Sequence, residues 1–191
     1  MGKGKKLAIF DLDGTLFDTK DVNFRAYSRA IQECGYQADI DYKYYCNFCN
    51  GNNYKTFLPA LIPRITPQGM QAIHDAKKKL YASYLKYAVK NESLFSLIES
   101  IRGEYVIALV TTASRENVDD ILKEFRVAEE FDIIITQEDV INCKPAPECF
   151  LLAMEWSGVM AENTIIFEDS ESGLKAAEAS GAAYVKVHGY N

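Results

Sequence analysis

The sequence predicts an α/β fold, in which a doubly wound parallel sheet forms the core and a small α-helical domain is inserted into it. In the C-terminal half, short apolar segments alternate with amphipathic helical segments, a pattern typical of parallel sheets with helices on both faces. A tyrosine-rich stretch without a convincing strand pattern follows the first apolar segment. We therefore expect a core domain from residues 1–19 and 91–191 and a helical domain from residues 20–90.

The first strand is predicted at residues 7–10, a short apolar run bounded by charged residues. Asp11 and Asp13 follow it, and their spacing directs both side chains the same way as the chain leaves the extended conformation. Gly14 then permits a sharp turn. An ordinary Asp-Gly turn would have the same local sequence, so the meaning of this pair depends on the other motifs.

The inserted stretch is expected to be helical throughout. Apolar residues recur at helical spacing from residue 20 until Gly35, which is a typical helix terminator. Thr66 and Pro67 have the character of an N-cap and a first helical residue, and they precede a long helix with apolar positions as far as Tyr87.

Helices and strands alternate in the remainder of the chain. Helices are expected at 94–101, 116–125, 148–156 and 173–180, and strands at 105–110, 131–135, 164–167 and 183–187.

Composition narrows the possible functions. The 191 residues are 48% hydrophobic and 25% charged, as in globular proteins, and the formal net charge of −6 argues against nonspecific nucleic-acid binding. No apolar run approaches the roughly 20 residues of a membrane span, and no signal-peptide pattern opens the chain. We expect a cytoplasmic protein with neither a nucleic-acid nor a membrane partner; the oligomeric state is not readable from the sequence.

The cysteines do not indicate a special function. Their number, five, is odd and suggests a reducing compartment without a disulfide framework. Cys46 and Cys49 have the C-x-x-C spacing, but there is no second pair, and the only histidines are His74 and His188. A zinc site would therefore lack ligands, and we interpret the pair as ordinary thiols.

Polar residues follow the predicted strands at one edge of the sheet. Thr111 and Thr112 come after the second strand, and Glu168 and Asp169 come at the end of the strand at 164–167. Lys144 stands in a proline-rich segment between them. Each group has a simpler explanation as a helix cap, a solvated lysine or a turn. Together they indicate one crevice, because parallel strands present their carboxyl ends on the same side.

Electrostatics indicate the chemistry of this crevice. Two carboxylates at about 4 Å repel by roughly 4 kcal/mol at an effective dielectric constant near 20, so such a cluster needs a cation or a proton. Oxygen donors suit Mg²⁺, and a lysine with hydroxyl groups beside it completes a site for a phosphoryl group. An ionised aspartate in that position can attack phosphorus.

Four motifs together resemble the haloacid dehalogenase superfamily, in particular the subfamily with a helical cap after the first motif. They are Asp11-Leu-Asp-Gly-Thr, Val110-Thr-Thr-Ala-Ser, Lys144-Pro and Glu168-Asp-Ser. The resemblance implies a Rossmann-like core and a Mg²⁺-dependent phosphatase that hydrolyses a small phosphorylated metabolite through an aspartyl-phosphate. Asp13 disfavours dehalogenase chemistry, because the phosphatase branch carries this second carboxylate.

The same resemblance implies roles for individual residues. Asp11 is expected to be the nucleophile, and Asp13 the general acid and then the general base. Mg²⁺ is expected to bind Asp11, the backbone carbonyl of Asp13 and Asp169, with Glu168 nearby.

Lys144 and a threonine are expected to hold the phosphoryl oxygens. Thr112 is preferred, because the sequence from Thr112 to Arg115 fits the family's Ser/Thr-x-x-Arg form; Thr111 stays open, and Ala113 is a further expected contact.

The helical domain is expected to act as a cap that supplies substrate contacts. The candidates are Asn23, Gly51 and Lys55, together with Arg25, Asn50, Asn52 and Asn53; alternatively, these are ordinary exposed residues. The tyrosines of this region are expected mainly in the cap's own core.

Two alternatives to a phosphatase remain open. Several motifs resemble β-phosphoglucomutases, but Asn23 stands where these carry a cap histidine, and this favours hydrolysis over a mutase reaction. A catalytically silent phosphate- or protein-binding member is the other, and the intact set of acidic residues and Lys144 argues against it. Sugar phosphates, phosphoglycolate and nucleoside monophosphates all remain possible substrates.

Overall fold

The computed structural model describes residues 6–38, 40–50 and 53–188 and contains two compact units. We call residues 1–18 with 89–191 the core unit and residues 19–88 the helical unit. The core unit is a five-stranded parallel sheet flanked by helices, so the predicted α/β class is confirmed. Its strands are β1 (Lys6–Phe10), β4 (Tyr105–Val110), β5 (Ile133–Ile135), β6 (Thr164–Glu168) and β7 (Ala183–Lys186).

The strand order β5-β4-β1-β6-β7 makes the sheet doubly wound. From β1 the chain runs outward through β4 and β5, then returns to the other side of β1 for β6 and β7. The carboxyl ends on either side of β1 therefore form a switch point, where ligands bind in such sheets. Phe10 pairs with Leu109 on one side and with Phe167 on the other, so the three strands end at the same level.

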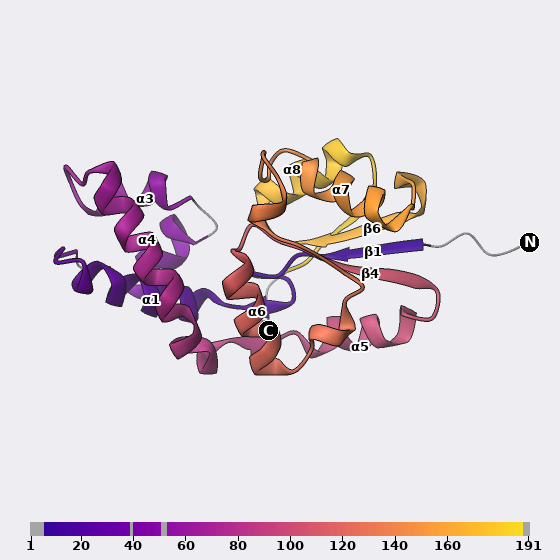
Figure 1. Cartoon of the computed structure of the whole chain (residues 1–191), viewed down its shortest axis with the longest axis horizontal. Coiled ribbons are helices and arrows are strands. Elements are labelled where there is room, and N and C mark those ends of the chain that lie inside the picture. The colour runs from indigo at the N-terminus through magenta and orange to yellow at the C-terminus, as the bar shows by residue number, and fades with distance from the viewer. Residues whose placement is uncertain (1–5, 39, 51–52, 189–191) are drawn as a thin grey trace, which may run out of the picture. The chain divides into compact units, whose positions relative to one another are not determined.

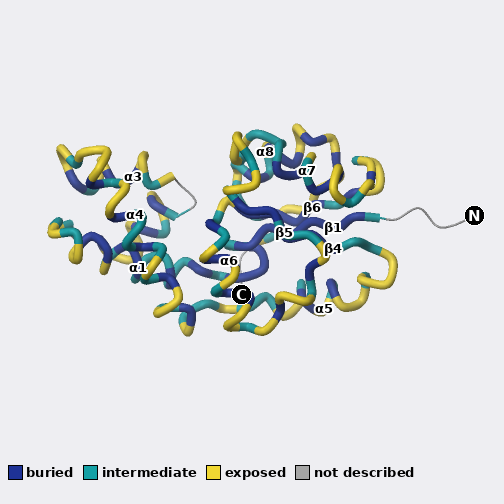
Figure 2. The backbone as a smooth tube through the Cα atoms, viewed as in Figure 1, coloured by how far each residue is buried: buried dark blue, intermediate teal, exposed yellow. Residues whose placement is uncertain are grey.

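Helices cover both faces of this sheet. Figure 1 shows α7 (Glu148–Ser157) and α8 (Glu171–Ser180) on one face, and α5 (Glu92–Ile101) and α6 (Arg115–Phe125) on the other. Leu7 and Ile9 of β1 pack in one buried cluster with Phe150 of α7 and Ala176 of α8. The sheet interior is dark blue in Figure 2, while the outer faces of the helices are yellow. Two-sided burial explains why the central strands are continuous apolar runs in the sequence.

Two differences from the predicted elements have local causes. The strand predicted at 131–135 begins only at Ile133, because the Asp132 carboxylate accepts the Ile107 amide in place of a ladder bond. The short strands β2 (Phe17–Asp18) and β3 (Val89–Lys90) pair antiparallel, and the sequence did not predict them. Two residues are too few to form a hydrophobic period.

Every element of regular secondary structure in the described part of the helical unit is a helix, as expected. They are α1 (Lys20–Glu33), α2 (Tyr42–Tyr44), the π-helix η1 (Tyr45–Cys49), α3 (Tyr54–Leu61), α4 (Pro67–Tyr81) and the 3₁₀-helix η2 (Ala82–Tyr87). The Thr66 hydroxyl accepts the Gly69 amide at 3.1 Å, so Thr66 is the N-cap of α4 and Pro67 its first residue. The helix is shorter than predicted, because the backbone tightens to a 3₁₀-helix after Tyr81.

Aromatic residues form much of the buried core of the helical unit. The rings of Tyr27 and Phe57 meet edge to face at 5.1 Å, and both pack against Ile73 of α4 in one buried cluster. Tyr42 behaves differently, since 45% of its surface is exposed. Cys46 and Cys49 are free thiols, and burial raises the pKa of Cys49 to about 11, which keeps it protonated at neutral pH.

His74, a residue of α4, contacts two tyrosines of the helical unit, Tyr54 and Tyr27. Its ring stacks on Tyr54 at 4.0 Å between centroids, and its Nδ1 lies 3.2 Å from the Tyr27 hydroxyl. Burial and the neighbouring Lys77 lower the pKa of His74 to about 4.

We expect the free energy of unfolding to fall as the pH is lowered from about 6.5 to about 4. In this window the unfolded imidazole binds a proton that the folded one does not, and the loss should be about 1 kcal/mol at pH 5 after allowance for solvent screening. Urea unfolding of the wild type and His74→Gln at pH 7.5 and pH 5 measures it. His188→Gln, which removes the exposed histidine, should keep the wild-type slope; an equal slope in His74→Gln would contradict the assignment.

Candidate active site

Lys144 occupies the centre of the carboxyl edge of the sheet. Its Nζ lies 2.6 Å from Asp11 Oδ1, 2.6 Å from Glu168 Oε2 and 3.1 Å from the carbonyl oxygen of Val110. These three acceptors stand at the ends of β1, β6 and β4. Only 3% of the lysine side chain is exposed, so one buried ammonium joins the ends of three adjacent strands.

Asp11 is the first residue after β1 and is almost fully buried. Its amide donates to the Phe167 carbonyl at 3.0 Å, which continues the pairing of β1 with β6 by one residue. Oδ1 accepts Lys144, whereas Oδ2 makes no hydrogen bond with the described residues. One oxygen of this carboxylate is therefore fixed and the other is left for a ligand or a reaction.

Glu168 ends β6, and 1% of its surface is exposed. Oε2 accepts Lys144, and Oε1 accepts the amides of Asp169 and Ser170 and the Ser170 hydroxyl at 3.2, 3.0 and 2.8 Å. Both oxygens of Glu168 are thus occupied by protein donors.

Asp169 completes an acidic group that could hold a metal ion. One carboxylate oxygen from each of Asp11, Glu168 and Asp169 lies within 4.8 Å of the others. With the Lys144 ammonium, the three carboxylates leave a formal charge of −2. Hard oxygen donors and two uncompensated negative charges fit a divalent cation such as Mg²⁺.

The pKa values of the group reflect this excess of negative charge. Burial and the neighbouring Glu168 raise the pKa of Asp11 well above its ordinary value, although Lys144 acts in the opposite direction. Burial and Glu168 likewise raise the pKa of Asp169 to about 6. Burial alone would lower the pKa of Lys144, but Asp11 and Glu168 raise it, so the lysine stays charged. A cation at the site would favour the ionised carboxylates.

Two glycines leave room for the carboxylates of Asp169 and Glu168. Gly14 has φ of +91°, and a Cβ on it would overlap the Asp169 carboxylate. Gly173, in the first turn of α8, lies against the Glu168 carboxyl group in the same way. The Thr15 hydroxyl donates to Asp169 Oδ1 at 3.1 Å and fixes that side chain from the turn after β1.

The second motif lies directly after β4. Thr111 is buried, and its hydroxyl accepts the Ala113 amide at 3.0 Å, whereas Thr112 is exposed. Ser114 is the N-cap of α6. The alternative interpretation of Thr111 and Thr112 as caps of the following helix is wrong, because Ser114 holds this position and accepts the Asn117 amide.

The remaining predicted residues lie in the turn after β1, in the helical unit or outside the described residues. Asp13 stands in the turn after β1, and its side chain does not belong to the three-carboxylate group. In the helical unit, the Asn23 amide nitrogen donates to the Thr19 hydroxyl at 3.1 Å, and Lys55 is exposed at the start of α3. Gly51 lies outside the described residues.

Sequence reasoning assigned no role to Thr15, Ser170 or Gly173. Thr15 and Ser170 belong to motifs that were recognised, so their position was a usable signal. Gly173 had none, because a glycine that must admit a carboxylate has the same sequence signature as any other glycine.

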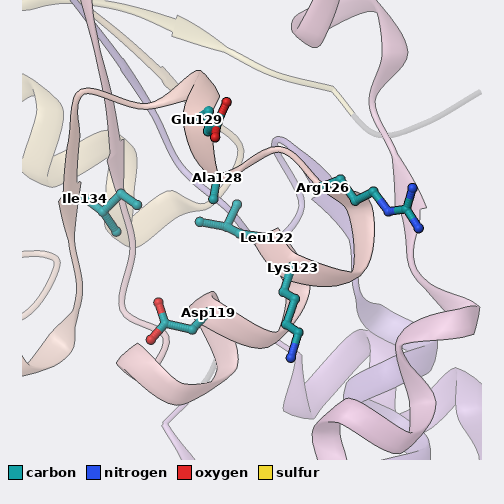
Figure 3. A pocket seen from close by; sticks show the side chains of 7 residues that line it. All are labelled: Asp119, Leu122, Lys123, Arg126, Ala128, Glu129 and Ile134. Carbon is teal, nitrogen blue, oxygen red and sulfur yellow. The ribbon is translucent and has the colours of Figure 1, made fainter.

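A separate cavity of about 430 Å³ lies between α6, the 3₁₀-helix η3 (Ala128–Glu130) and β5. Figure 3 shows its side chains: Leu122 and Ile134 approach it, while the charged end of Arg126 extends away. None of its lining residues belongs to the acidic group, so this cavity has no part in the site.

The fold and this edge define the protein as a Rossmann-like α/β enzyme with an acidic, lysine-containing site at the switch point of its sheet. Residues 8–187 match the sequence profile of the haloacid dehalogenase-like hydrolases, and the chain belongs to this family. The predicted family is confirmed, as is the prediction of an enzyme of the phosphoric monoester hydrolase class.

Individual relatives support this conclusion. The chain is 29% identical to the phosphorylated carbohydrates phosphatase of Thermotoga maritima, over 96% of this chain and 86% of that protein. It is 28% identical to the fructose-1-phosphate phosphatase YqaB of Escherichia coli, over 94% of each. Among solved structures, CbbY from Rhodobacter sphaeroides in complex with phosphate superposes with a TM-score of 0.85 at 25% identity, over 97% of this chain and 87% of that one.

Within the described residues, no helix has the length and apolar character needed to cross a membrane.

We expect Gly173→Ala to destabilise the protein by about 1–3 kcal/mol, because the new methyl group displaces the buried Glu168 carboxylate. Helix propensity alone would favour alanine, so the sign of the change identifies the clash. Urea unfolding measures it. Gly103→Ala is the matched control, since nothing lies within 4 Å of its added Cβ; equal stability of the two variants would contradict the close-approach argument.

Proposed function

We propose that the protein is a Mg²⁺-dependent phosphatase that hydrolyses a small phosphorylated carbohydrate through an aspartyl-phosphate on Asp11. The observation that carries the proposal is the Asp11 carboxylate, whose Oδ1 is fixed by Lys144 and whose Oδ2 has no hydrogen bond with the described residues, beside two further carboxylates. A nucleophile must present one oxygen in a fixed direction, and this arrangement supplies it.

In the proposed reaction, Asp11 Oδ2 attacks phosphorus and the bond from phosphorus to the leaving oxygen breaks. That oxygen keeps the electron pair and takes a proton from Asp13, which is two residues further along the turn. A water molecule then attacks the phosphorus of the aspartyl-phosphate. Asp13 accepts a proton from this water, the Asp11–phosphorus bond breaks, and inorganic phosphate leaves.

The charges for this reaction come from a metal ion and from Lys144. Asp11, Asp169 and the backbone carbonyl of Asp13 would hold Mg²⁺, with Glu168 nearby. When bound, Mg²⁺ neutralises charge on the phosphoryl oxygens. Lys144 supplies a second positive charge, and because it is buried and tied to three acceptors it needs little reorganisation.

Thr112 is the proposed hydroxyl donor to the phosphoryl group, with Ala113 beside it. Its exposure supports this choice, since Thr111 is buried.

Residues 20–90 are proposed to serve as the cap domain, with Asn23, Gly51 and Lys55 as substrate contacts. The sugar-phosphate class is supported by the relatives from Thermotoga maritima and Escherichia coli, which are a phosphorylated carbohydrates phosphatase and a fructose-1-phosphate phosphatase. Asn23 cannot relay a proton as a histidine can, which favours hydrolysis over phosphoryl transfer between two positions of a sugar.

With Mg²⁺ present, we expect the protein to release inorganic phosphate from p-nitrophenyl phosphate and from members of a panel of hexose and pentose phosphates. EDTA should remove this activity, because the acidic group would lose its counter-ion. With hexose 1-phosphate, free phosphate indicates a hydrolase and hexose 6-phosphate a mutase. Absence of both products, and of p-nitrophenol, would leave the silent binding protein as the correct interpretation.

We expect Asp11→Asn to lower kcat to about 10⁻⁴ of wild type or less, because an amide oxygen is too weak a nucleophile to form the acyl phosphate. Circular dichroism should show an unchanged fold, and ³²P-labelled substrate should label the wild type but not this variant. Asp119→Asn, on the exposed side of α6, is the matched carboxylate control. Turnover in Asp11→Asn close to that of the control would exclude Asp11 as the nucleophile.

A further inference from the structure

The segment that carries Lys144 is exposed, although the end of the lysine side chain is buried. Ile141, Asn142 and Cys143 are all exposed, with 91% of the Ile141 surface accessible. The Lys144 ammonium, by contrast, lies 2.6 Å from each of two carboxylates. Apolar packing therefore does not fix the backbone from 141 to 143, and polar contacts must hold it.

Glu148 provides these contacts. Its Oε1 accepts the Ile141 amide at 2.7 Å, and its Oε2 accepts the Asn142 amide and the Asn142 side-chain nitrogen, both at 2.9 Å. These hydrogen bonds, the one from the Ile141 amide first, lower the pKa of Glu148 below its ordinary value, so the carboxylate is ionised at neutral pH.

Glu148 is itself anchored to the sheet. It is the first residue of α7, and Cys149 and Phe150, which follow it, are buried in the cluster that covers β1 and β4. The Phe150 ring also lies beneath the Lys144 ammonium, 5.0 Å from Nζ to the ring centroid. Inside the loop closed by Glu148, the Ala146 amide donates to the Cys143 carbonyl at 3.1 Å. A continuous path thus runs from the sheet through α7 and Glu148 to the backbone next to Lys144.

We propose that Glu148 is a positioning residue of the phosphoryl site: its carboxylate holds the backbone at 141 and 142 so that Lys144 reaches Asp11, Val110 and Glu168. This inference rests on the proposed function, because it concerns the reaction that Lys144 supports. Glu148 acts through Lys144 and does not touch the substrate.

A carboxylate is required at this position. It offers only acceptors, and both of its oxygens face N–H donors. In Glu148→Gln one oxygen becomes an NH₂ group that faces another donor, so at least one of these bonds is lost while size and shape are kept. Glu155 is a matched control: it lies on the same helix, is exposed, and its carboxylate has no hydrogen bond or ion pair with the described residues.

The test compares the wild type, Glu148→Gln and Glu155→Gln, assayed with p-nitrophenyl phosphate and Mg²⁺. We expect kcat of Glu148→Gln to fall about 10- to 100-fold, because small displacements of a catalytic charge have effects of this size. Inhibition by orthovanadate, which adopts the five-coordinate geometry of phosphoryl transfer, should weaken about 10-fold or more, while KM changes less. Glu155→Gln should match the wild type.

Thermal unfolding of the same samples separates positioning from loss of fold. A partly unfolded sample has fewer active molecules, but those molecules keep the wild-type inhibition constant for orthovanadate. Unchanged orthovanadate inhibition in Glu148→Gln would therefore overturn the inference, whatever its kcat. A kcat of Glu148→Gln within about twofold of that of Glu155→Gln would also overturn the inference, and it would leave the phosphatase proposal intact. A wild type that releases no phosphate would instead overturn the proposed function, and this inference with it.

Discussion

The buried ammonium of Lys144 is the interaction on which the site depends. It contacts groups at the ends of β1, β4 and β6, which come from distant parts of the chain. An ion network with so little exposure is stable only if each charge keeps its partner, because removal of one partner leaves an uncompensated charge in a low-dielectric environment. The strand order makes the network possible, since β1 lies between β4 and β6 and the three strands end at the same level.

The site does not balance its own charge. The group holds three carboxylates and one ammonium, which contacts two of them, and the raised pKa values of Asp11 and Asp169 reflect this excess of negative charge. A protein selected for stability alone would compensate these charges or replace them with apolar residues. The close approach of Gly14 and Gly173 to two of the carboxylates shows that the backbone is shaped to keep them together. Such an arrangement is typical of sites that bind a cation or stabilise a charged reactant.

The sequence predicted the features that repeat or that stand at fixed places in the fold. Short apolar runs that alternate with helical segments predicted the parallel sheet. Polar residues directly after these runs predicted Asp11, Glu168 and Asp169, which the structure brings together with Lys144. The sequence could not predict side-chain contacts with backbone groups. The bonds from Glu148 to the amides of 141 and 142 follow no residue pattern, since any residue has an amide. The β2–β3 pair was missed because its segments have no period.

The three carboxylates differ in environment rather than in chemical type, and this difference suggests separate roles. Glu168 has both oxygens bound by protein donors, so its charge is used to hold Lys144 and the start of α8. Asp169 has one oxygen fixed by Thr15, and Asp11 has one fixed by Lys144. In each aspartate the hydrogen bond orients the carboxylate and leaves the second oxygen available to a ligand. A site of this kind combines a rigid frame with reactive groups, because each acidic side chain has its orientation set by a different strand or turn.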